Sequence, residues 1–228
     1  MKLDWEKQVE EYNMVWERRY QTPDVTESWV ENEWAHGRKQ YLTFLIKVKD
    51  DELIKNVKEI QTELSKYACV ETFPPEYFHI TIKGVGFLVP QKTEKDEITT
   101  DEIPRIIKEA RTRLNKYSPF EMKLEHLNHF FSAIVVQAHD GGVVRHIHKN
   151  FGEIPGFIKS RYYQGYLPHL SIAQYKSAKE YTEFIKHLEQ ERNTKVGHIK
   201  VDRIQLIIAH LPVEGRFPKL ETVEEFLL

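Results

Sequence analysis

The feature that most constrains this chain is an order of elements that occurs twice: a strand, a helix, and a second strand that carries a histidine. The first round begins at Tyr41 and reaches His79 after 38 residues, and the second begins near Ser132 and reaches His169 after 37. Sequence identity between the halves is low, so the prediction depends on element order and spacing. We expect two halves of similar structure.

The hydrophobic pattern predicts both strands and helices along the chain. Strands are expected where apolar residues alternate or form short runs, and helices where they recur every three or four residues. The predicted strands cover 41–48, 77–90, 120–130, 132–140, 166–175 and 198–211, the last as one long strand. The predicted helices cover 50–67, 103–117, 143–154 and 178–193, and 91–104 is a predicted loop. This alternation indicates a mixed α and β fold.

The first 40 residues differ in character from the rest. Large apolar residues recur there at steps of three or four, which predicts an amphipathic helix. They are Trp5, Val9, Tyr12, Trp16 and Tyr20. We divide the chain into an N-terminal helical extension, 1–40, and a single bilobal domain, 41–228. The extension is interpreted as docking on the body of the protein, with partner binding or covering of the substrate as the alternatives.

Charge and cysteine content restrict the partners and the location. Thirty-three basic residues against thirty-five acidic ones give a net charge of -2, so no global positive field is available to hold a long polyanion. A small or terminal nucleic-acid substrate fits better. The first 20 residues contain no continuous apolar stretch, so neither a secretion signal nor a membrane span is expected. The single Cys69 cannot form an internal disulfide, and a cytoplasmic location is predicted.

The two histidine segments, HITI and HLSI, share one pattern. On a strand, residues two apart project from the same face, so His79 lies beside Thr81 and His169 beside Ser171, while the intervening aliphatic residues project from the other face. Histidine can donate or accept a proton near neutral pH, which is what phosphodiester cleavage requires at the attacking and leaving oxygens. A nearby hydroxyl can donate a hydrogen bond to a nonbridging phosphate oxygen.

Composition alone makes about one His-x-Ser/Thr pattern expected in a chain with 11 histidines, and two occur. The context carries more weight than the count. Both segments lie in predicted strands, at equivalent places in the two predicted halves. We therefore interpret them as a matched pair that brackets one phosphate.

The segments YFHITIKGVGF and YLPHLSIAQY resemble the two signature segments of the two-histidine phosphoesterase superfamily, which includes RNA-ligase-like 2′,3′-cyclic phosphodiesterases. The resemblance implies an α+β, bilobal fold with two pseudo-symmetric lobes of mostly antiparallel sheet, outer helices and a central cleft. It also implies that His79 and His169 are the catalytic acid and base, that Thr81 and Ser171 bind phosphate, and that neither a metal nor another cofactor takes part. The near-symmetry of the motifs leaves open which histidine is the acid.

Residues that flank the motifs are candidates for substrate binding. Lys83 shares parity with His79, so on a regular strand it points into the cleft, with a solvated lysine at the end of the strand as the alternative. Aromatic residues beside the motifs are candidates for stacking on a base, with packing in the core as the alternative use. They are Tyr77, Phe78, Tyr163 and Tyr166. Several other histidines are closely spaced, but they lack the partners and spacing of a known metal motif, so we predict no metal site. They are His126, His129, His146 and His148.

The sequence thus predicts a metal-independent phosphodiesterase that acts on a nucleotide or an RNA end, at a 2′,3′-cyclic phosphate or a 2′-5′ linkage. Three alternatives remain at this point. One is a 3′ exonuclease on single-stranded RNA, whose longer substrate requires a basic track leading to the cleft. The others are a noncatalytic RNA or nucleotide binder and a protein-interaction module built on the N-terminal helix.

Overall fold

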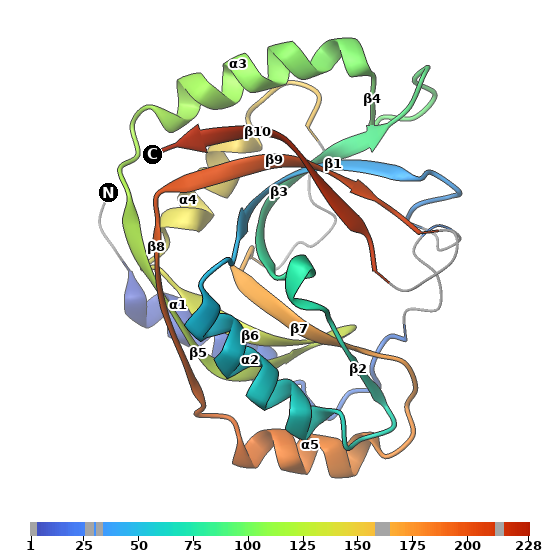
Figure 1. The fold of residues 1–228 in the computed structure, drawn as a ribbon, viewed down its shortest axis with the longest axis vertical. Coiled ribbons are helices and arrows are strands. Elements are labelled where there is room, and N and C mark those ends of the chain that lie inside the picture. Colours follow the sequence, from blue (N-terminus) through green and yellow to red (C-terminus); the bar gives the residue numbers. More distant parts are fainter. Residues whose placement is uncertain (1–3, 26–29, 31–33, 158–164, 213–216) are drawn as a thin grey trace.

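The computed structural model describes residues 4–25, 30, 34–157, 165–212 and 217–228. Its strands form a single ten-stranded sheet with the order β10-β9-β1-β3-β7-β6-β5-β8, to which β2 adds beside β7 and β4 beside β3 (Figure 1). All pairs are antiparallel except β3 with β4. The predicted mixed fold with a mostly antiparallel sheet is confirmed.

The bounds of the elements agree with most of the predicted ones. The strands are β1 (Gln40–Lys47), β2 (Val70–Thr72), β3 (His79–Leu88), β4 (Glu97–Ile98), β5 (Phe120–Phe130), β6 (Ala133–His139), β7 (His169–Tyr175), β8 (Lys195–Val201), β9 (Arg203–His210) and β10 (Lys219–Leu227). The α-helices are α1 (Trp5–Trp16), α2 (Asp51–Leu64), α3 (Ile103–Leu114), α4 (Val143–Phe151) and α5 (Tyr181–Gln190). Two short 3₁₀ helices lie at Pro75–Tyr77 and Thr100–Glu102.

The predicted repetition is present in three dimensions. The order β1-α2-β3 in one half matches β6-α4-β7 in the other. The two histidine strands, β3 and β7, are neighbours at the middle of the sheet, with β1 outside β3 and β6 outside β7. The halves are therefore joined along their histidine strands.

The prediction of one long strand over 198–211 is wrong. The chain forms β8 and β9, which are separated at Asp202 and lie in different halves of the sheet. β8 pairs with β5 at one edge, whereas β9 pairs with β1 and β10. A continuous apolar pattern does not reveal such a crossing, because both strands keep the extended conformation. β10 was not predicted either. Only Phe226 is buried in this edge strand, so its sequence lacks the regular apolar pattern of the inner strands.

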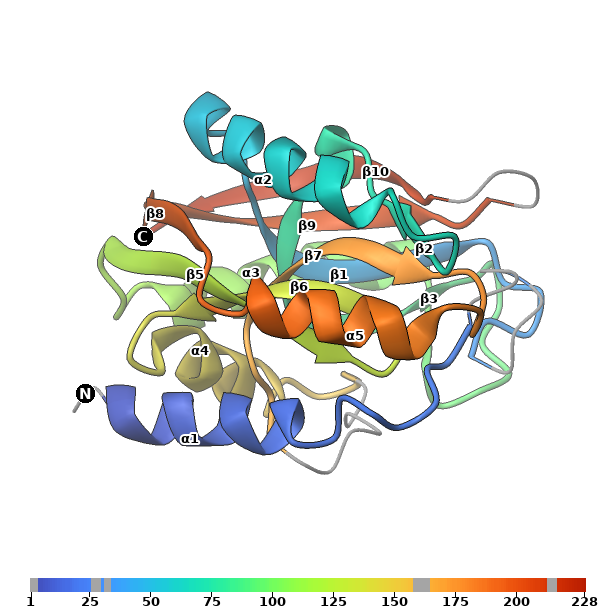
Figure 2. The same ribbon diagram turned by 90° about the horizontal axis from the view of Figure 1, so that it is seen from below.

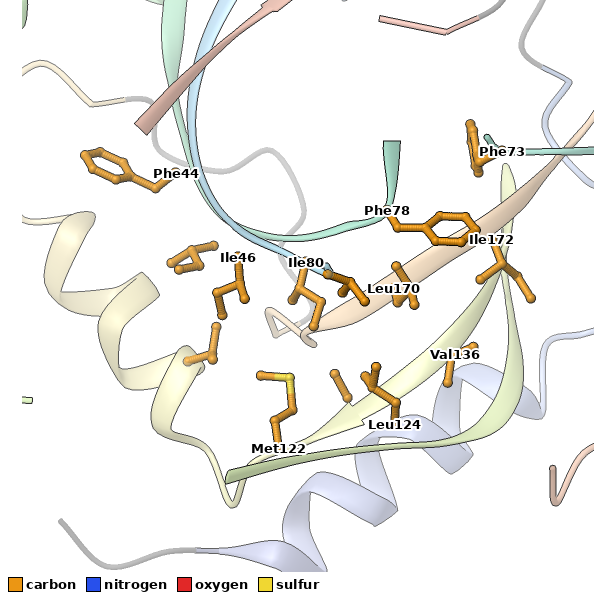
Figure 3. Packing of buried hydrophobic residues seen from close by; sticks show 14 of the residues in the cluster. Phe44, Ile46, Phe73, Phe78, Ile80, Met122, Leu124, Val136, Leu170 and Ile172 are labelled. Atoms are coloured by element: carbon orange, nitrogen blue, oxygen red, sulfur yellow. The ribbon is translucent and has the colours of Figure 1, made fainter. Parts of the chain in front are cut away.

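One apolar core joins the two halves. Ile80 and Leu170 lie at its centre (Figure 3). The helices α2 and α4, one from each half, pack on strands of the opposite half. α4 packs on β3, with the Phe151 ring 4.5 Å from that of Phe44, while α2 packs on β7 and β8. This exchange of helices makes the position of each histidine strand depend on both halves.

The predicted N-terminal helix is confirmed over Trp5–Trp16, but its buried face differs from the predicted one. Trp5 and Val9 are exposed, whereas Gln8 and Tyr12 are buried against β5 and β6. Hydrogen bonds explain why Gln8 is buried: its amide donates to the Ala138 carbonyl at 3.1 Å and to Asp140 Oδ1 at 3.0 Å. α1 lies on the side of these strands opposite α2 (Figure 2).

Candidate active site

The two histidine motifs meet where β3 joins β7. Ile80 of β3 is the register partner of Leu170 of β7, and both side chains are fully buried in the core. Continuing this antiparallel register by one residue sets His79 opposite Ser171 and Thr81 opposite His169. Because side chains alternate along a strand, these four project from the face opposite the two aliphatic residues. We call this the site face; all four of its side chains are partly exposed.

Each histidine is held by the same backbone contact. His79 Nδ1 lies 2.5 Å from the Tyr77 carbonyl oxygen, and His169 Nδ1 lies 2.8 Å from the Leu167 carbonyl oxygen. A carbonyl only accepts, so Nδ1 carries the proton in both rings and Nε2 keeps a free lone pair. This hydrogen bond could not be predicted from the sequence because backbone acceptors have no residue signature, although the acceptor lies two residues before the histidine in both motifs.

The site favours neutral imidazoles in the free protein. Burial lowers the pKa of His79 to about 4, and the charges of His169 and Lys47 act in the same direction. Burial also lowers the pKa of His169. At neutral pH both rings are therefore ready to accept a proton on Nε2. An anion bound between them would raise both pKa values and help one ring to become an acid.

Both histidine strands contain a β-bulge at the same place, just after the hydroxyl residue. Thr81 pairs with Leu45 and Lys83 with Phe44, so Ile82 has no register partner on β1. In the other half Ser171 pairs with Val135 and Ala173 with Ile134, so Ile172 has no register partner on β6. Each bulge inserts one extra residue and reverses the side-chain parity beyond it.

The bulge overturns the expectation that Lys83 points into the site. As the partner of Phe44, Lys83 faces the same side as that core residue, and only 4% of it is exposed. Its Nζ lies near Gly152 at the end of α4. Lys83 would share the face of His79 only on a regular strand, and β3 is not regular at this position.

The flanking aromatic residues have different surroundings. Phe78 is buried in the core, so its candidate role in base stacking is not supported. The Tyr77 ring meets the His79 ring edge-on with centroids 4.8 Å apart. Tyr166 lies against β3, where its hydroxyl donates to the Thr81 carbonyl. Tyr163 lies outside the described residues.

Sequence reasoning missed two further residues of the site. Lys47 is the register partner of His79 on β1, and its Nζ donates to Thr222 Oγ1 at 2.8 Å. Phe130 of β5 lies beside His169, with ring centroids 4.5 Å apart. Strand parity alone could have placed Lys47 on the site face, whereas Phe130 depends on the pairing order of the strands.

A cavity of about 520 Å³ has Lys47 in its wall, but none of the four side chains of the site face lines it. Lys49, Lys200 and Arg203 contribute further positive charge. Asp50, Glu121 and Asp202 also line it, so its charge is mixed.

The closely spaced histidines noted in the sequence are not gathered with other ligands. Within the described ranges, no three His, Cys, Asp or Glu side chains are arranged to hold a metal ion. His129, for example, is buried with Nδ1 2.9 Å from the Tyr175 hydroxyl. In the same part of the chain, no helix combines the length and apolarity needed to span a membrane.

Comparison with known proteins agrees with this geometry. Residues 42–211 match the model of the 2′-5′ RNA ligase superfamily. Escherichia coli LigT complexed with 3′-AMP shares the fold at a TM-score of 0.60 and 11% identity, covering 83% of this chain and 98% of LigT. The Thermus thermophilus protein TT0787 gives a TM-score of 0.55 and 16% identity, covering 82% of this chain and 97% of that one. No curated protein sequence matches the chain.

Two half-sheets joined at paired histidine strands are the architecture of a two-histidine phosphoesterase. The family match covers most of the chain, and the chain therefore belongs to the 2′-5′ RNA ligase superfamily.

Proposed function

We propose that this protein is a metal-independent phosphodiesterase that hydrolyses a 2′,3′-cyclic phosphate or a 2′-5′ linkage, with His79 and His169 as its acid and base. The observation that carries the proposal is the matched pair of imidazoles. Both have Nδ1 bound to a carbonyl two residues upstream, so both direct Nε2 away from that contact. Such a pair can exchange a proton at either end of one phosphate.

In the forward reaction, the neutral histidine removes a proton from water while the water oxygen bonds to phosphorus. The protonated histidine gives its proton to the leaving ribose oxygen as the phosphorus–oxygen bond breaks. The Thr81 and Ser171 hydroxyls donate to nonbridging oxygens, where negative charge is held. The product is a phosphomonoester and a free hydroxyl, and the two histidines exchange protonation states. Reversal of these roles describes ligation.

The charge of the chain favours a small substrate over a long RNA. A 3′ exonuclease requires a basic track, whereas the chain has a net charge of -2 and no global positive field. A nucleotide or an RNA end needs only the site itself and one or two local cations, such as Lys47. The LigT structures hold 3′-AMP and NADP⁺, which is compatible with a nucleotide substrate here.

We further propose that residues 1–40 are an addition to a catalytic domain formed by 41–228. The protein would act in the cytoplasm on products of RNA processing. The single Cys69 is a free thiol, which is compatible with a reducing compartment.

The substrate class can be tested with a panel in excess chelator: 2′,3′-cyclic mononucleotides, 2′-5′ and 3′-5′ dinucleotides, and a single-stranded RNA. Products are identified by chromatography and ³¹P NMR. We expect turnover of a cyclic phosphate or a 2′-5′ dinucleotide and none of the 3′-5′ dinucleotide. Stepwise shortening of the RNA would instead identify an exonuclease, and nucleotide binding without any product would identify a noncatalytic binder.

A further inference from the structure

The bulge in β3 is held from outside the sheet by side chains that bind two consecutive backbone carbonyls, those of Thr81 and Ile82. Ile82 has no register partner on β1 and follows directly after the hydroxyl residue of its motif. Contacts that fix these carbonyls also restrain the backbone that carries the Thr81 hydroxyl. In β7 the corresponding carbonyl, that of Ile172, accepts a backbone hydrogen bond from the Phe73 N–H at 2.9 Å.

A helix side chain from the opposite half of the molecule binds the Ile82 carbonyl. His148 of α4 lies with Nδ1 2.7 Å from the Ile82 carbonyl oxygen. The contact in the other half differs, because Gln61 of α2 donates its amide to both the Ile172 and the Phe73 carbonyls, each at 2.7 Å, and so bridges β7 and the residue after β2. His148 does not belong to a histidine motif.

The His148 contact is reinforced by a second one on the preceding carbonyl. The Tyr166 ring stacks on the imidazole with centroids 4.2 Å apart and planes inclined by 8°. Its hydroxyl donates to the Thr81 carbonyl at 2.5 Å. The stacked pair thus holds two consecutive carbonyls of the bulge in β3. The two contacts together restrain the peptides on both sides of Ile82 more than either contact alone.

We propose that His148 and Tyr166 are positioning residues that orient the Thr81 hydroxyl for phosphate binding. This inference depends on the proposed function, in which Thr81 binds a nonbridging oxygen. It predicts that His148 acts as a hydrogen-bond donor and not as a proton carrier. Glutamine should replace it, because its amide can also donate to the Ile82 carbonyl.

The test compares His148→Leu, His148→Gln and Tyr166→Phe, each made in the intact chain and again together with Thr81→Val. His146→Leu is the matched control, because His146 is an exposed histidine of the same helix whose ring lies against that of Tyr117, with centroids 6.0 Å apart. The measured quantity is kcat/KM for the cyclic nucleotide or 2′-5′ dinucleotide, with thermal unfolding followed in parallel. Tyr166→Phe removes a single hydroxyl, so it serves if His148→Leu does not fold.

With Thr81 present, His148→Leu and Tyr166→Phe should each lower kcat/KM by about 5- to 30-fold, and His148→Gln by less than about threefold. In the Thr81→Val background the same changes should cost less than about twofold, because the hydroxyl that they position is gone. An equal loss in both backgrounds would overturn the inference alone. Full activity of Thr81→Val, or an inactive intact protein, would overturn the proposed function and the inference with it.

Discussion

Ile80 and Leu170 lie opposite each other where the two histidine strands meet, and neither side chain is exposed. Their pairing fixes the register of both motifs and also places both side chains in the shared core. The residues that carry the chemistry and those that stabilise the fold thus alternate along the same two strands. Damage to the core face should therefore affect both properties.

Leu170→Ala should lower the free energy of unfolding by about 2–5 kcal/mol, because it leaves a cavity where the two halves join. Chemical denaturation monitored by tryptophan fluorescence measures the change. Leu227→Ala makes the same substitution at a residue that is 74% exposed and should cost less than about 0.5 kcal/mol. Equal losses in the two variants would show that Leu170 is not part of a packed core.

The protein should lose stability in mild acid because several histidines are buried in the neutral form. Burial lowers the pKa values of His79, His129 and His139 to about 4 each. Between about pH 6.5 and 4 the unfolded chain then binds more protons than the folded one. Their stabilisation is complete above pH 6.5 and is lost as the pH falls towards 4, at up to about 1.4 kcal/mol per pH unit for each histidine. Denaturation at pH 8, 6 and 4.5 measures this; equal stability at pH 8 and 4.5 would contradict it.

Lys47→Gln should shift the pH dependence of catalysis upwards. Lys47 is one of the charges that lower the pKa of His79, so its removal makes the imidazolium easier to form. Glutamine is the residue at the equivalent place in the other half, where Gln137 pairs with His169. The pH profile of kcat/KM reports the pKa values of the free enzyme. The step in this profile that belongs to His79 should move to higher pH by a few tenths of a unit. Lys58→Gln on α2 is the control; an unmoved profile in Lys47→Gln would show that Lys47 does not act on His79.

Lys83→Met should leave the activity intact, because Lys83 faces the core side of β3 and not the site face. We expect kcat/KM to change by less than about twofold. Stability should stay equal or increase, since a buried amine loses its hydration on folding and methionine does not. A tenfold rise in KM without loss of stability would place Lys83 in the substrate site after all.

The sequence was sufficient for the repeated order of a strand, a helix and a histidine strand, and for the two motifs. Aliphatic residues alternate with the motif residues, as Ile80 does in one strand and Leu170 in the other, and this alternation indicates strands. The similar distance from the preceding strand to His79 and to His169 indicates the repetition. These features are local, and a local pattern predicts them well.

Other features depend on which strands become neighbours. The bulge at Ile82 is a property of the pairing with β1, and it reverses the direction of Lys83. The break at Asp202 occurs because the chain passes from one half of the sheet to the other. Gln8 is buried because it meets backbone groups and a carboxylate beyond β6, which no helical pattern records. Partners distant in sequence decided each of these outcomes.

The most direct test of the account is the turnover of the best substrate in excess chelator by the intact protein, His79→Ala, His169→Ala and the control His146→Ala. We predict a loss of about 10²- to 10⁴-fold in kcat for each of the first two variants, full activity in the control, and unchanged folding in all. Activity that survives both His79→Ala and His169→Ala would contradict the assignment of the site.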